Sequence, residues 1–61
     1  MDYLKLLNKL VLIETNQIKN ELKKYSIENV RELIIYIENN ITINSSKIDL
    51  IYQIIDEDFL N

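Results

Sequence analysis

Apolar side chains recur every three or four residues through almost the whole chain, and no glycine or proline interrupts them. This spacing follows the turn of an α-helix, whereas a half-buried strand would alternate apolar and polar residues. A chain of 61 residues forms one domain at most, over residues 1–61. The pattern therefore predicts a small all-α domain built from amphipathic helices.

Three helices are predicted, over about residues 2–25, 27–40 and 46–59. The polar run at residues 14–17 is a candidate break in the first helix, but a single continuous helix is the favoured interpretation. Ser26 is a good N-cap for the second helix. Ser46, with Asp49 three residues later, resembles a capping box at the start of the third.

Each predicted helix has one apolar face that we expect to form the core. These faces consist of Leu4, Leu7, Val11, Ile18, Leu22 and Tyr25 in the first helix, Ile27, Val30, Ile34, Ile37 and Ile41 in the second, and Ile48, Ile51, Tyr52, Ile55 and Phe59 in the third. The stretch LIIYI alone is also compatible with a buried strand, but the spacing over the whole second segment favours a helix.

A second group of apolar residues lies outside these faces, and a three-helix monomer of this size has too few neighbours to cover them all. The group consists of Tyr3, Leu6, Leu10 and Ile13 in the first helix, and Leu50 and Ile54 in the third. Monomers rarely expose large contiguous apolar patches, so we predict that these six residues form a protein interface. The simplest version is a homodimer. The alternative is a scatter of exposed apolar side chains without a role.

The chain contains neither cysteine nor histidine. Disulfides, thiolate or imidazole ligands for zinc, and the usual base–nucleophile pairs are therefore unavailable. There is also no glycine-rich loop to hold a phosphate. We expect a non-enzymatic protein without a cofactor, a metal or a small-molecule substrate. Because so short a chain has marginal stability, self-association or a bound protein is the expected means of completing the fold.

Charge divides the chain into two unlike halves. Residues 1–25 hold five lysines and three acids, a net charge of +2, and residues 26–61 hold two basic residues and seven acids, a net charge of −5. The acids Asp56, Glu57 and Asp58 form a tail that is either a solubilising terminus or a segment that binds a basic partner. Direct nucleic-acid binding is not expected, because the third helix, the recognition helix of a helix-turn-helix, is acidic.

No apolar run approaches the roughly 18 residues needed to span a membrane. The first residues, MDYLKLLNKLVLI, make a poor signal peptide because they include an early Asp and lack a small-residue cleavage site. We therefore expect a cytoplasmic protein. Abundant Ile, Asn and Lys without Ala, Gly or Pro indicate an AT-rich genome, as in a low-GC bacterium, a phage or a virus. For a viral protein, the expected location is the cytoplasm of the host.

One short motif resembles a known family. SSKIDLI, residues 45–51, is similar to the S-Q-E-L-D motif of the small sporulation-regulator aspartyl-phosphate phosphatases of low-GC bacteria, with Ser45 and Asp49 matching. Upstream, LIETNQ resembles that family's I-E-x-x-R, although Gln17 replaces the Arg and the gap is long for a simple hairpin. The resemblance implies a helical hairpin in which Asp49 helps to hydrolyse the phosphoaspartate of a response regulator. Helix capping alone also accounts for these residues.

These observations together predict a regulator, inhibitor or adaptor that acts by burying an apolar helix face on a protein partner or in a homodimer. Two alternatives remain open from the sequence: an acidic mimic of nucleic acid that inhibits a DNA- or RNA-binding protein, and the phosphatase.

Overall fold

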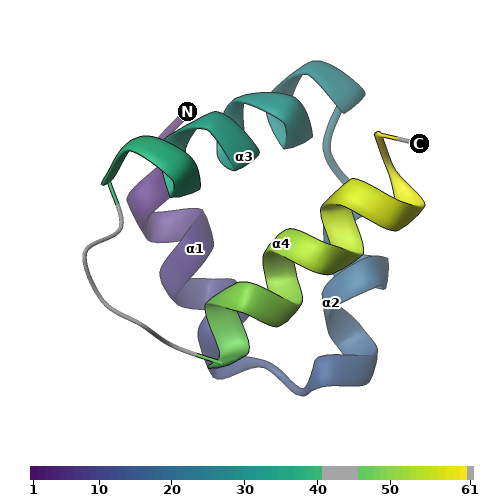
Figure 1. Ribbon diagram of the computed structural model, residues 1–61. Coiled ribbons are helices and arrows are strands. Elements are labelled where there is room, and N and C mark those ends of the chain that lie inside the picture. Colours follow the sequence, from purple (N-terminus) through teal and green to yellow (C-terminus); the bar gives the residue numbers. More distant parts are fainter. Residues whose placement is uncertain (41–45, 61) are drawn as a thin grey trace.

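The computed structural model describes residues 1–40 and 46–60. These residues form the helices α1 (Tyr3–Leu12), α2 (Thr15–Leu22), α3 (Ile27–Asn40) and α4 (Ser46–Asp58), and no strand occurs among them (Figure 1). The all-α prediction is confirmed, and α3 and α4 match the second and third predicted helices. Ile41, which the sequence assigned to the core face of the second helix, and Ser45 lie outside the described residues.

The prediction of one continuous helix over residues 2–25 was wrong, because the chain leaves the helical conformation at Ile13 and Glu14. Ile13 has φ −84° and ψ 165°, and Glu14 has φ −67° and ψ 147°, so both are extended. A continuous helix of this length would be about 36 Å long at roughly 1.5 Å per residue. The longest dimension of the folded chain is 25 Å. The break therefore lets both halves lie within the fold, where each contacts α4 (Figure 1).

Polar side chains define the beginnings of two helices. The Asp2 carboxylate accepts a hydrogen bond from the Lys5 N–H at 3.1 Å and begins α1. The Ser26 hydroxyl accepts one from the Asn29 N–H at 3.2 Å, which confirms Ser26 as the predicted N-cap of the next helix. At the start of α2, by contrast, the N-cap is Glu14, whose side chain makes no capping hydrogen bond in the described structure.

Helix α4 is the central element, because it packs against α1, α2 and α3 (Figure 1). Its first turn is also tied to the break, since the Lys47 ammonium donates a hydrogen bond to the Ile13 carbonyl oxygen at 2.6 Å. The core between the four helices contains Leu6, Leu7, Leu10, Ile18, Leu22, Val30, Leu33, Ile34, Ile37, Ile51 and Ile55.

The predicted core faces of α3 and α4 are largely confirmed, since Val30, Ile34 and Ile37 on α3 and Ile51 and Ile55 on α4 are buried. The face of α1 differs. Its buried residues are Leu6, Leu7 and Leu10, a face that lies between the two stripes seen in the sequence. Two residues predicted for the core, Leu4 and Ile27, lie at the margins of the buried faces and are exposed.

Candidate functional site

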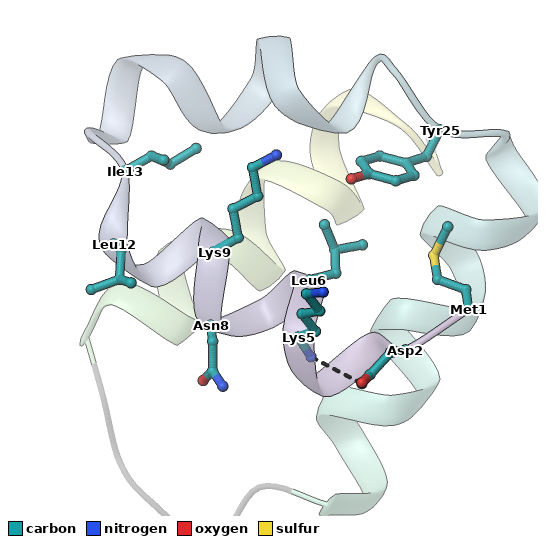
Figure 2. Close-up of a pocket in the computed structure, with 9 residues that line it drawn as sticks. All are labelled: Met1, Asp2, Lys5, Leu6, Asn8, Lys9, Leu12, Ile13 and Tyr25. Atoms are coloured by element: carbon teal, nitrogen blue, oxygen red, sulfur yellow. Dashed lines mark hydrogen bonds between the residues drawn. The ribbon is translucent and has the colours of Figure 1, made fainter.

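An open groove with a volume of about 620 Å³ runs along α1. Its lining residues come from the two residues before α1, from α1 itself, from the break that follows it and from the turn after α2. They are Met1, Asp2, Lys5, Leu6, Asn8, Lys9, Leu12, Ile13 and Tyr25 (Figure 2). Most of the lining therefore comes from α1 and from the residues at its two ends.

The groove has an apolar lining that solvent can reach. Leu12 is 85% exposed and Met1 is 61% exposed, the two highest values among the large hydrophobic residues that the structure describes. Ile13 and Tyr25 are half-buried, so each also presents part of its apolar surface. An exposed leucine alone is ordinary, but exposed apolar side chains gathered along one groove are typical of a binding surface.

A buried carboxylate beside the groove joins α2 to one of the lining residues, Lys9. The Glu21 side chain, on α2, is 8% exposed and forms ion pairs with the Lys9 ammonium at 2.5 Å and the Lys24 ammonium at 3.0 Å. Its Oε1 atom is fully buried and makes no hydrogen bond of ordinary geometry within the described residues, so the Lys9 ion pair is its compensation there. Figure 2 shows Lys9 extending from α1 toward α2, between Ile13 and Tyr25.

The ion pairs shift the pKa values of both partners. Contact with the Lys9 and Lys24 ammonium groups lowers the pKa of Glu21 below its ordinary value of 4.5. Contact with Glu21 raises the pKa of Lys9 above its ordinary value of 10.5. Both groups are therefore charged at neutral pH. The pair stabilises the fold above the ordinary pKa of a glutamate and ceases to do so as the pH falls through the lowered pKa of Glu21.

Replacing Glu21 with glutamine is therefore expected to lower the thermal midpoint at neutral pH. The midpoint of the variant should also fall less than that of the wild-type protein as the pH is lowered. Below pH 4.5, where an unperturbed glutamate begins to take up a proton, the wild-type protein should lose the contribution of Glu21, and the two midpoints should converge. Circular dichroism melts between about pH 6 and pH 3 measure this convergence.

Glu14→Gln is the matched control, because Glu14 is exposed and forms no ion pair among the described residues. Its thermal midpoint should follow that of the wild-type protein at every pH. A difference between the wild-type protein and Glu21→Gln that stays constant from neutral pH to acid would contradict the assignment of the acid-sensitive contribution to this carboxylate.

The structure separates the four α1 residues that the sequence assigned to an interface. Leu6 and Leu10 are buried in the core, at 6% and 0% exposure, and are not available to a partner in this fold. The Tyr3 hydroxyl donates a hydrogen bond to Asn29 Oδ1 at 3.5 Å, and its ring lies 6.3 Å from that of Tyr36, so it joins α1 to α3. Ile13 lines the groove and is half-buried there, and the buried Leu6 also forms part of the lining.

The two α4 residues assigned to the interface lie elsewhere. Leu50 is half-buried and lines a shallow depression of about 420 Å³, together with Thr15, Ser46, Lys47, Asp49 and Gln53. Ile54 is half-buried against the core. The acid of the phosphatase-like motif, Asp49, is therefore at the surface beside Thr15, whereas Ser45 lies outside the described residues.

The acidic tail is part of α4 and its immediate continuation. Asp56, Glu57 and Asp58 are all exposed, and Asp58 lies 3.6 Å from the Lys19 ammonium. Phe59 and Leu60, which follow, are half-buried and pack against the core. The tail therefore combines exposed acids with apolar side chains that the fold itself uses.

Sequence reasoning missed Met1, Leu12 and Tyr25 as residues of one surface. Leu12 lies outside both apolar stripes of the predicted first helix and stands between two other apolar residues in the sequence. Its position away from both stripes was a signal of exposure, but only the break brings it into one groove with Tyr25.

Among the residues that the structure describes, no group of three or more acidic, histidine or cysteine side chains is placed to hold a metal ion. In the same residues, no helix is both long and apolar enough to cross a membrane. The chain matches no protein-family model, and no curated protein or solved structure is significantly similar to it.

Proposed function

We propose that the protein is a non-enzymatic interaction module that docks a protein partner, or a second copy of itself, in the groove along α1. Such a module would act as a regulator, inhibitor or adaptor in the cytoplasm. The observation that carries the proposal is the exposed apolar lining of the groove, with Leu12 at 85% exposure and Met1 at 61%.

The mechanism is burial of these side chains on binding. Removing apolar surface from water contributes about 25 cal/mol per Å² buried, and this term drives most protein association. The rest of the fold supports the groove, because Leu6 and Leu10 anchor α1 in the core while Leu12 is left free on its outer side. Helix α1 can therefore present its exposed face to a partner while its buried face stays packed in the core.

A binding comparison of three proteins tests this proposal. The wild-type protein, Leu12→Asp and Ile35→Asp are each tagged and used to retain partners from a lysate of the source organism. Leu12→Asp places a charge in the groove and should reduce retention by about tenfold or more, as expected for a central interface side chain. Ile35 is 42% exposed on α3 and does not line the groove, so Ile35→Asp should retain the partner as the wild-type protein does.

Sedimentation equilibrium of the same three proteins covers the case of a second copy. The proposal would be supported equally well if the wild-type protein and Ile35→Asp sedimented as dimers while Leu12→Asp sedimented as the 7.3 kDa monomer. Circular dichroism must show that each variant keeps its helix content. Equal retention and equal sedimentation by all three folded proteins would exclude the groove as the docking surface.

A further inference from the structure

The groove is basic within an acidic protein. The whole chain has a net charge of −3, yet Lys5 and Lys9 line the groove, and Lys24 lies beside it through its ion pair with Glu21. The acids nearby already have partners within the fold. Asp2 caps α1, and Glu21 binds both Lys9 and Lys24. Lys5 is exposed and forms no ion pair among the described residues, so its charge is available to a ligand.

This charge distribution argues against a symmetric contact between two copies. In a twofold dimer the same surface faces itself, so a contact through the groove would bring the unpaired charge of Lys5 toward its own counterpart. Like charges placed against each other across an interface are unfavourable, and they are a common means of rejecting a wrong partner. A ligand with acidic side chains beside an apolar stripe would match both the lysines and the lining.

The length of α1, which supplies most of the groove lining, suits a helix as the ligand. Helix α1 has 10 residues. It is therefore about 15 Å long, which corresponds to between two and three turns of a helix lying along it. An amphipathic helix presents apolar residues at i, i+3, i+4 and i+7 over that length and binds in apolar grooves through them.

We propose that the groove binds an acidic amphipathic helix of another protein, an inference that rests on the docking function proposed above. The apolar stripe of that helix would cover Leu12, Ile13 and Tyr25, and its acids would lie near Lys5 and Lys9. The proposal specifies the partner by its chemistry: leucine-like residues at helical spacing, flanked by Asp or Glu.

Two synthetic helical peptides with an identical leucine stripe test it, one flanked by glutamates and the other by lysines. Each is titrated into the ¹⁵N-labelled protein at low ionic strength, and amide shifts are followed by NMR. The glutamate peptide should bind about tenfold or more tightly than the lysine peptide. Its shifts should centre on Leu12, Ile13 and Tyr25, and added salt should weaken its binding.

Lys5→Glu and Arg31→Glu form a matched pair, because each changes the net charge equally and both residues are exposed. Lys5→Glu should abolish the preference for the glutamate peptide, and Arg31→Glu, outside the groove, should keep it. Equal binding of both peptides in the groove would contradict the proposal that the partner is acidic. It would still agree with the proposal that the groove is a docking surface.

Other results would also overturn the acidic-helix proposal. One is a shift of the groove amides when the protein is concentrated without peptide, which would identify a second copy as the occupant. The others are binding of the glutamate peptide on α3 or α4, and no binding of that peptide at all. The lysate comparison is independent of these peptides and decides the docking function separately.

Discussion

Leu10→Ala is expected to remove between about a fifth and all of the stability of the fold. Leu10 is 0% exposed at the centre of the buried face of α1. Truncating a buried leucine to alanine costs about 2–5 kcal/mol, because the lost transfer free energy is joined by the cost of the cavity. A domain of this size has a free energy of unfolding of about 3–9 kcal/mol, at roughly 0.05–0.15 kcal/mol per residue. Urea unfolding followed by circular dichroism measures the loss.

Leu12→Ala is the matched control, since it makes the same change two residues later on the same helix. Leu12 is 85% exposed, so its truncation should change the free energy of unfolding by no more than about 0.5 kcal/mol. Similar losses for the two variants would contradict the orientation of α1 on which the groove depends.

The same pair distinguishes a core residue from an interface residue. The sequence assigned Leu10 to an interface, and an interface side chain would make stability depend on protein concentration. In the fold, Leu10 is buried within one chain, so the destabilisation in Leu10→Ala should be equal at low and high micromolar concentration. A loss that appears only at the higher concentration would restore the interface assignment.

Local signals in the sequence were sufficient to predict α3 and α4. Both helices have a serine at their start and an apolar residue every three or four positions. The structure confirms the bounds at Ile27, Asn40 and Ser46, and α4 ends at Asp58, one residue before the predicted end. Helix α3 was predictable from its cap at Ser26 and its periodicity, and α4 from its periodicity, because these signals act over a few residues and tertiary packing agrees with them.

The polar run at residues 14–17 indicated a candidate break after α1, but the sequence did not favour it over a continuous helix, because the cause of the break is tertiary. Nothing between Leu12 and Thr15 prevents a helix, since the segment contains no glycine or proline. The chain bends there because α4 offers apolar surface to both halves and because the Lys47 ammonium binds the Ile13 carbonyl oxygen. These contacts become visible only once the helices are placed in space.

The candidate site depends on that break, and for this reason the site could not be predicted from the sequence either. In a continuous helix, Lys9 and Glu21 would lie about 18 Å apart along the axis, at roughly 1.5 Å per residue. In the fold their charged groups are 2.5 Å apart. The apolar residues of α1 also have other roles than the sequence indicated, since Leu6 and Leu10 are buried in the core and Leu12 is exposed in the groove.

A pair of proline substitutions tests the break directly, and one of them should have a large effect. Asn20→Pro places proline inside α2, where it removes a helical hydrogen bond and clashes with the preceding turn, at a cost of about 3 kcal/mol or more. Glu14→Pro should instead leave stability unchanged or raise it by up to about 1 kcal/mol. The φ of Glu14 is −67°, the value that proline requires, and Ile13 before it is extended, as a residue preceding proline prefers.

Glu14→Ala and Asn20→Ala are the references, because they remove each side chain without fixing the backbone. The quantity to compare is the change in urea midpoint from each alanine variant to its proline variant. If residues 2–25 formed one helix, both positions would be helix interiors and both prolines would be severely destabilising. A tolerated proline at position 14 together with a disruptive one at position 20 requires a break between α1 and α2. The groove depends on the same break, because Ile13 of the break lines it.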